Sequence, residues 1–116
     1  MKLMISPIFE RLTVPITESA ENALAASLLR EGCKEPVSVW NGIIVDGHKR
    51  YRICELEHIE FAVQEIGCKT EEEAVIWACR QRTAALSPDS QAYRYLMGKW
   101  YLSEVLINRS IKKPRI

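Results

Sequence analysis

Long apolar runs are missing from this chain of 116 residues. No stretch approaches the ~20 consecutive apolar residues that a membrane-spanning helix needs. The opening residues, 1–7, are too short for the core of a signal peptide, and no small-residue cleavage site follows them. We therefore expect a cytoplasmic protein with no membrane partner, built as one domain over residues 1–116, because this length supports a single core.

Closely spaced metal ligands are also lacking. The cysteines are Cys33, Cys54, Cys68 and Cys79. None of them belongs to a Cys-x-x-Cys pair, and the only histidines, His48 and His58, lie ten residues apart. Zinc sites usually combine such close pairs, so no structural metal is predicted. Cys54 and Cys79 lie in apolar surroundings, where a free cysteine packs as a small hydrophobic side chain.

An excess of one charge is absent as well. The chain has 16 Lys and Arg against 15 Asp and Glu, a formal net charge of +1. A protein that binds nucleic acid over its whole surface concentrates Lys and Arg, so any anion site here must be local. One basic cluster spans residues 48–52, and a second lies in a basic tail at 108–116. The basic residues of the tail are Arg109, Lys112, Lys113 and Arg115. We expect this tail to be a solvated chain end.

A β-hairpin is the clearest local pattern. Residues 37–40 and 43–45 are mostly apolar and flank Asn41 and Gly42. This dipeptide tolerates positive φ at both central positions of a type I′ turn, which matches the twist of paired strands. Pairing across the turn would place Trp40 opposite Ile43 and Val39 opposite Ile44.

Helix and strand patterns surround the hairpin. Strands are predicted at 8–14 and 61–66, and helices at 20–31, with Thr17 or Ser19 as N-cap, and at 48–57. Thr70 and Glu73 form a capping box for a helix that ends near residue 82. Ser87 as N-cap and Pro88 as first residue would open an amphipathic helix over about 88–107. The predicted fold class is therefore α/β (α+β), a small mixed sheet with a β-hairpin packed by about four helices.

A basic run begins where the second hairpin strand passes into a helix. Its members are Gly47, His48, Lys49, Arg50 and Arg52. A first helical turn carries free backbone N–H groups and a partial positive charge, and glycine allows a sharp turn. The run therefore suits a phosphate or another oxyanion. Solvation, or pairing of the basic side chains with glutamates, is the alternative.

Asp46 and His48 have two interpretations each. Asp46 is either a turn or capping residue, which is the commoner use, or a metal ligand or general base beside a bound phosphate. His48 is either a proton donor or a polar residue of the first turn. Both are candidate catalytic residues only if the protein is an enzyme.

Three segments, in this order, resemble the ParB/sulfiredoxin superfamily, which includes the ParB N-terminal domain or "ParB-like nuclease" domain. Residues 32–39 are similar to its Gly-x-x-x-Pro-[Ile/Val]-x-Val segment, residues 45–52 to its Gly-x-x-Arg-x-Arg box, and residues 86–92 to its Leu-Ser-Pro segment. The resemblance covers about residues 20–95. It implies the ParB/sulfiredoxin fold for most of the chain.

The resemblance also implies a function. The Gly-x-x-Arg-x-Arg box of ParB proteins binds the phosphates of CTP, which assigns Gly47, Arg50 and Arg52 to phosphate binding. It implies CTP or another nucleoside triphosphate with Mg as cofactor, and nucleotide or nucleic-acid phosphate as partner. The chain would be a nucleotide- or DNA-associated module of a plasmid-partition, chromosome-segregation or mobile-element regulator. A homodimer is a separate expectation, which comes from the aromatic residues of the last helix.

Two segments differ from the family. Residues 79–83 occupy the position of a Glu-Asn-x-x-Arg motif that helps ParB bind nucleotide and magnesium, but they lack the Glu and the Asn. Arg80 and Arg82 are therefore only secondary phosphate-binding candidates. His48 occupies the position of the catalytic cysteine of sulfiredoxins, so sulfiredoxin chemistry is not predicted.

Two alternative functions stay open. Residues 46–50 are close to the box of the superfamily's free serine kinases, which favours a phosphotransferase with Asp46 or Glu18 as base. A nuclease on the same scaffold ranks lower, because only Asp46 and Glu55 supply carboxylates near the box. The third reading is a protein-interaction domain with an aromatic dimer surface on the last helix. The residues of that surface would be Tyr93, Tyr95, Trp100 and Tyr101.

Overall fold

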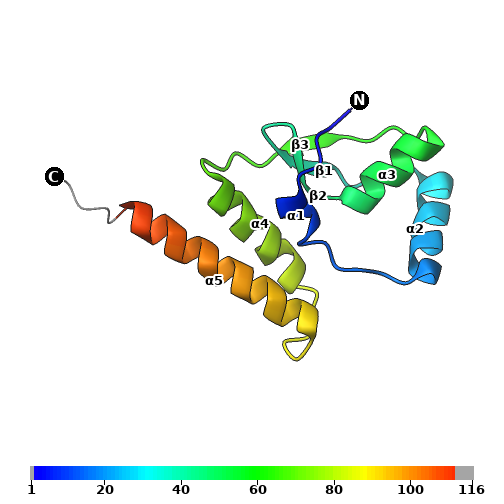
Figure 1. Cartoon of the computed structure of the whole chain (residues 1–116). Helices are drawn as coiled ribbons and strands as arrows, with labels where there is room; N and C mark the ends of the chain where they lie inside the picture. The colour runs from blue at the N-terminus through cyan, green and yellow to red at the C-terminus, as the bar shows by residue number, and fades with distance from the viewer. Residues whose placement is uncertain (1, 112–116) are drawn as a thin grey trace. The chain divides into compact units, whose positions relative to one another are not determined.

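The turn at Asn41 and Gly42 organises a small sheet in the computed structural model, which describes residues 2–111 (Figure 1). Both turn residues have positive φ, 52° and 79°, as a type I′ turn requires. β1 (Val37–Trp40) and β2 (Ile43–Asp46) pair antiparallel around it. Trp40 faces Ile43 and Val39 faces Ile44. The predicted hairpin and its register are confirmed.

A third strand makes the sheet mixed. β3 (Val63–Glu65) runs parallel to β1, and the strand order is β2-β1-β3. It is shorter than the predicted strand at 61–66, because β1 offers only four residues for pairing. Single hydrogen bonds extend the ladder at each end, from the Val37 amide to the Ala62 carbonyl and from the Ile66 amide to the Val39 carbonyl. The predicted small mixed sheet is confirmed.

The N-terminal segment differs from its prediction. Residues 8–14 do not form a strand; α1 (Pro7–Glu10) is a short helix that starts with Pro at its first position. Ser6 is its N-cap and accepts a hydrogen bond from the Ile8 amide. The strand-like contact lies earlier, where the Met4 amide donates to the Gly42 carbonyl over 3.0 Å. Pro7 favours the helix start because its missing N–H costs nothing there.

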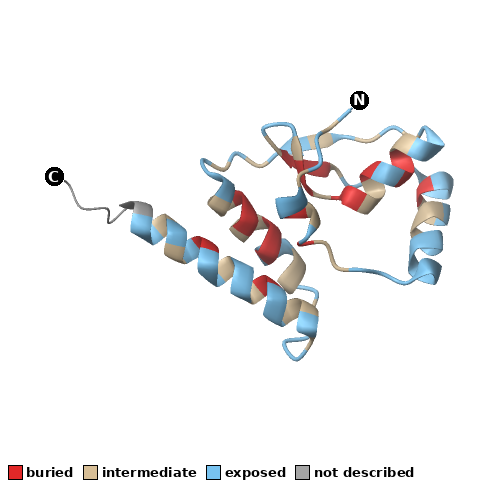
Figure 2. Cartoon of the chain, in the orientation of Figure 1, coloured by how far each residue is buried: buried red, intermediate tan, exposed pale blue. Residues whose placement is uncertain are grey.

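Two helices pack beside each other after α1. α2 (Glu18–Glu31) begins at Thr17, whose hydroxyl accepts from the Ala20 amide, and only Leu28 of α2 is buried (Figure 2). α3 (His48–Glu57) has the predicted bounds. Leu28 forms one apolar cluster with Ile53 and Cys54 of α3. This cluster holds α3 against α2.

A second apolar cluster fixes α3 to the sheet. It contains Val37, Val39 and Ile44 of the hairpin and Tyr51 of α3. The Tyr51 ring also lies edge-on to Phe61 at a centroid distance of 5.6 Å, and its hydroxyl accepts from the Leu3 amide at 3.0 Å. The start of α3 is thus positioned by buried side chains on the hairpin.

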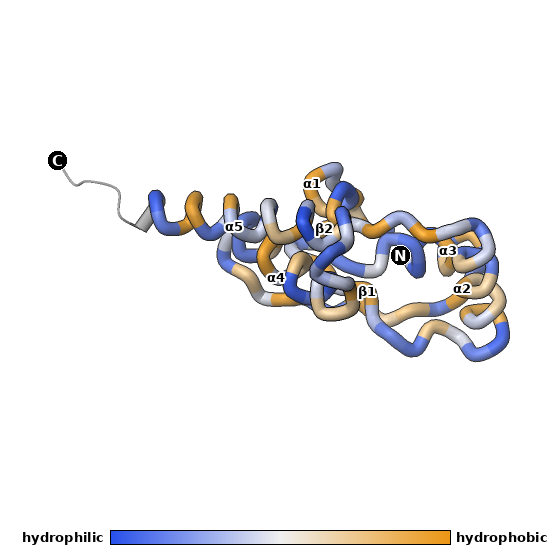
Figure 3. The backbone as a smooth tube through the Cα atoms, turned by 90° about the horizontal axis from the view of Figure 1, so that it is seen from below, coloured by the Kyte–Doolittle hydropathy of each residue, from blue (hydrophilic) through white to orange (hydrophobic). Residues whose placement is uncertain are grey.

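The chain divides after Ile66 into two compact units, and the second consists of α4 (Glu71–Thr83) and α5 (Gln91–Ile111). α4 buries Ala74, Val75, Ala78 and Cys79. The two helices pack on each other, and hydrophilic and hydrophobic residues alternate along α5 (Figure 3). The expectation of one domain stays a prediction. With α1 included, residues 2–111 hold five helices rather than about four.

The start of α5 is a correction to the sequence analysis. The helix begins at Gln91, not near residue 88, and Ser87 is not its N-cap. Ser87 and Ser90 close a turn instead, with the Ser90 amide donating to the Ser87 carbonyl at 3.0 Å. Ser90 caps the helix, because its hydroxyl accepts from the Tyr93 amide at 3.1 Å.

The end of α5 also differs from the prediction. The helix continues to Ile111, so Arg109 is helical rather than part of a tail. Lys112, Lys113 and Arg115 lie outside the described residues. None of the helices within residues 2–111 combines the length and the apolar character that crossing a bilayer requires.

Replacing Thr70 by alanine is expected to lower the free energy of unfolding by about 1 kcal/mol. The predicted capping box is present: the Thr70 hydroxyl accepts from the Glu73 amide, and the Glu73 carboxylate accepts from the Thr70 amide, each at 3.2 Å. Urea unfolding followed by circular dichroism measures the change. Ser19→Ala, inside exposed α2, is the control and is expected to change stability little. Equal losses in the two variants would contradict the capping role.

Candidate phosphate-binding site at the start of α3

Gly47 makes the junction between β2 and α3 possible. It is the N-cap of α3 with φ 103° and ψ 23°, and no side chain of residues 2–111 caps this helix start. A Cβ atom on Gly47 would lie 2.9 Å from Nη2 of Arg50 and 3.4 Å from Cα of Val37. Glycine is therefore needed twice, for the positive φ and for the close approach of a guanidinium group.

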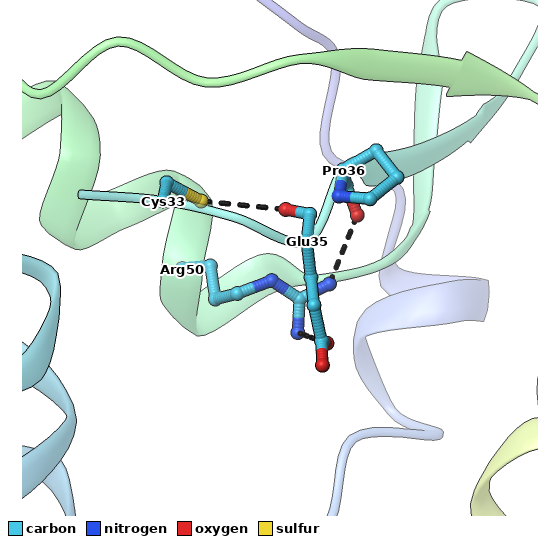
Figure 4. A network of polar contacts seen from close by, with 4 residues as sticks. All are labelled: Cys33, Glu35, Pro36 and Arg50. Carbon is cyan, nitrogen blue, oxygen red and sulfur yellow. Dashed lines mark hydrogen bonds and ion pairs between the residues drawn. The ribbon is translucent and has the colours of Figure 1, made fainter. Parts of the chain in front are cut away.

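Arg50 folds back over this glycine, and Figure 4 shows its guanidinium beside Glu35 and Pro36. Its Nη2 donates to the Pro36 carbonyl at 3.1 Å, and its Nη1 lies 3.7 Å from a carboxylate oxygen of Glu35. The Arg50 side chain is 21% exposed, whereas that of Glu35 is 80% exposed. Nε of Arg50 is buried without a hydrogen-bond partner among residues 2–111. The backbone thus orients the guanidinium, and only a loose, solvated carboxylate contact neutralises it.

Arg52 and Lys49 have partners elsewhere. Arg52 donates to a carboxylate oxygen of Glu10 in α1, and this hydrogen bond holds the pKa of Glu10 below its ordinary value. Nζ of Lys49 donates to the Val14 carbonyl at 2.9 Å. Residues two apart on a helix do not share a face. Arg50 and Arg52 thus have separate carboxylate partners, Glu35 and Glu10, which is the pairing with glutamates that the sequence left open as the alternative.

The candidate catalytic residues flank the same turn. Asp46 ends β2, is half-buried and lies opposite Ser38, where the register of the hairpin shifts. His48 is the first residue of α3 and is only 1% exposed. His48 is thus withdrawn from solvent, and Asp46 is less buried than His48. Their catalytic roles stay predictions.

The secondary candidates belong to α4 in the second unit. The Arg80 guanidinium lies over the Trp100 ring of α5, 5.4 Å from its centroid, and Arg82 is half-buried. Trp100 in turn donates from its indole nitrogen to Glu104 at 2.8 Å. Arg80 thus packs within the helix pair, where a cation–π contact adds to the stability of the unit.

Within residues 2–111 no three or more His, Cys, Asp or Glu side chains are placed to hold a metal ion together. A magnesium ion that arrives with a nucleotide takes most of its ligands from phosphates and water. The nucleotide with Mg therefore stays a prediction that depends on the phosphate site itself.

A depression of about 420 Å³ lies at the other end of α3 and was missed by the sequence analysis. It is lined by Cys54, Glu55, His58, Ile59, Glu60 and Phe61. His58 ends the helix with a positive φ of 57°. The helix dipole is negative at this end, and two glutamates add to it, so the depression repels phosphate. The Glu-rich sequence after Ile53 was the available signal.

Comparisons of the chain with protein-family models, with curated proteins and with solved structures gave no match. The fold and the site therefore define a structural class. It is a mixed α+β unit in which an arginine folds over the junction between a hairpin and a helix. The resemblance to the ParB/sulfiredoxin superfamily remains a prediction that depends on residues 32–39, 45–52 and 86–92.

Proposed function

We propose that the chain binds a phosphate group of a nucleotide or nucleic acid at the start of α3, with Arg50 as the principal ligand. One observation carries this proposal: the Arg50 guanidinium is fixed against Gly47 at a helix start that no side chain caps. An oriented guanidinium beside the positive end of a helix is a favourable place for an oxyanion.

Glu35 acts as a competitor in this proposal. Its exposed carboxylate lies 3.7 Å from Nη1 of Arg50, too far for a good hydrogen bond. A phosphate with a higher charge and three acceptor oxygens would displace it at little cost, because an exposed ion pair contributes about 0–1 kcal/mol. Removal of the Glu35 charge should therefore strengthen phosphate binding.

The remaining basic residues would have supporting roles. Lys49 and Arg52 lie on α3 and add positive potential near the site, although each now has its own partner. The ParB resemblance supports a nucleoside triphosphate such as CTP as the ligand, and a partition or mobile-element regulator as the biological setting. Because the net charge is only +1, binding should concentrate at this one site.

Titration of the full chain with CTP, ATP, inorganic phosphate and a short DNA duplex at low salt tests the proposal. Isothermal titration calorimetry should show saturable binding of at least one of them. Arg50→Ala is expected to weaken it roughly 10- to 100-fold, the value of one or two charge-assisted hydrogen bonds. Glu35→Gln is expected to tighten it.

Arg30→Ala is the matched control, since Arg30 is an exposed arginine of α2 near Glu31. It removes the same charge and should leave affinity nearly unchanged. Equal weakening in Arg30→Ala and Arg50→Ala would reduce the effect to general electrostatics. Absence of binding by all four probes would reject the proposed function.

A further inference from the structure

Cys33 and Cys54 come together from two segments that are 21 residues apart in the sequence. Cys33 lies just after α2 and packs on the apolar cluster that contains Leu28, Ile53 and Cys54. Burial first, and then the neighbouring Cys33 side chain, raises the pKa of Cys54. Among residues 2–111, Cys68 and Cys79 are not part of this cluster, and Cys33 and Cys54 are both free thiols.

We propose that Cys33 and Cys54 are an oxidisable dithiol pair that closes to an intramolecular disulfide when the protein meets hydrogen peroxide. This inference is independent of the phosphate site and goes beyond it. The disulfide would tie the loop between α2 and β1 to the middle of α3.

The surroundings assign a different part to each sulfur. Cys33 is only half-buried, so its thiol is reachable from solvent. This thiol donates a hydrogen bond to the Glu35 carbonyl at 3.3 Å (Figure 4). Cys54 is 1% exposed, and burial raises its pKa to about 11. A thiol that stays protonated is a poor first nucleophile. Cys33 is therefore the sulfur that peroxide meets first, and Cys54 is the resolving thiol.

The chemistry balances with peroxide as the only oxidant. The Cys33 sulfur attacks one peroxide oxygen; an S–O bond forms, the O–O bond breaks, and hydroxide leaves with the thiol proton as water. The Cys54 sulfur then attacks the Cys33 sulfur; an S–S bond forms, the S–O bond breaks, and a second water leaves with the Cys54 proton. Two thiols and one peroxide thus give one disulfide and two waters.

Proximity favours the second step. Cys33 packs on the cluster that contains Cys54, so attack is intramolecular between groups that the fold holds close together. Cys54 is also one of the residues that line the depression at the end of α3. Cys79, in contrast, is fully buried in the second unit, and Cys68 lies between β3 and α4.

Peptide mapping of the peroxide-treated full chain tests the pairing. Trypsin cuts after Arg30 and Lys34, so Cys33 lies in peptide 31–34. It also cuts after Arg52 and Lys69, so peptide 53–69 contains both Cys54 and Cys68. The Cys68→Ser variant removes this ambiguity. The expected product is peptide 31–34 linked to peptide 53–69, with the loss of two hydrogen atoms and a monomer on a non-reducing gel.

Cys33→Ser is the second variant, and it changes the more exposed member of the pair. It should abolish the link and leave Cys54 open to alkylation after unfolding. Three results would overturn the proposal: a link from peptide 31–34 to the peptide with Cys79, a link between two chains, or Cys33 converted to sulfinic acid while peptide 53–69 stays unlinked.

Discussion

Ile44→Ala is expected to lower the free energy of unfolding by about 3 kcal/mol, the largest stability loss that we predict for this chain. Ile44 is fully buried in β2 and forms one apolar cluster with Val37, Val39 and Tyr51. Removal of three side-chain carbons loses their transfer free energy and leaves a cavity that the short strands cannot close. Urea unfolding followed by circular dichroism measures the loss.

Ile43→Ala is the matched control, because Ile43 is the same residue type at the next position of the same strand. It is only half-buried and points to the other face of the sheet. We expect it to cost about 1 kcal/mol, since less apolar area leaves water. A similar cost for both variants would mean that the cluster on the Ile44 face does not dominate the stability of the first unit.

Gly47→Ala is expected to lower the free energy of unfolding by about 2–3 kcal/mol and to weaken phosphate binding as well. A methyl group at this position meets the Arg50 guanidinium at 2.9 Å, and the φ of 103° is strained for any side chain. Arg50 can yield only by moving away from Gly47 and the Pro36 carbonyl. The group that the proposed function requires would then leave the start of α3.

Gly42→Ala separates the effect of backbone strain from the effect of a steric contact. Gly42 also has a positive φ, 79°, but nothing lies within 4 Å of an added Cβ atom. We expect a loss of about 1 kcal/mol from strain alone, and unchanged phosphate affinity in calorimetry. If Gly47→Ala cost no more than Gly42→Ala and bound phosphate normally, the close approach of Arg50 would have no energetic role.

Elements fixed by near neighbours were predicted well. Asn41 and Gly42 specify the hairpin and its register because a type I′ turn is decided by the φ preferences of two adjacent residues. The capping box at Thr70 and Glu73 closes within four residues, and the start of α3 follows from Gly47. In each case the deciding interaction lies within one turn of the chain.

Two Ser-Pro pairs show where local pattern stops being sufficient. Ser6 and Pro7 open α1, whereas Ser87 and Pro88 form a turn and leave the capping of α5 to Ser90. Both pairs satisfy the same local rule for a helix start. The strand predicted for residues 8–14, directly after the first pair, and the cap assigned to Ser87 were both wrong, because the choice depends on contacts made after the turn closes.

The features of the candidate site also divide into local ones, which the sequence predicts, and long-range ones, which it does not. Its glycine and its basic run were predicted from adjacent residues, but the separate partners of Arg50 and Arg52 are set by Glu35, Pro36 and Glu10, which lie 14 to 42 residues away. The placement of Cys33 on the cluster that contains Cys54 arises likewise from packing between α2 and α3.

By itself, therefore, the sequence determined the hairpin turn, the capping box of α4 and the position of the basic helix start. Backbone preferences and hydrogen bonds between near neighbours are sufficient to set these features. The tertiary structure alone decided that β3 joins β1 in parallel, that Arg50 donates to the Pro36 carbonyl and that Cys33 packs on the cluster containing Cys54. Such contacts depend on how buried apolar clusters bring distant segments together, which no short window of residues encodes.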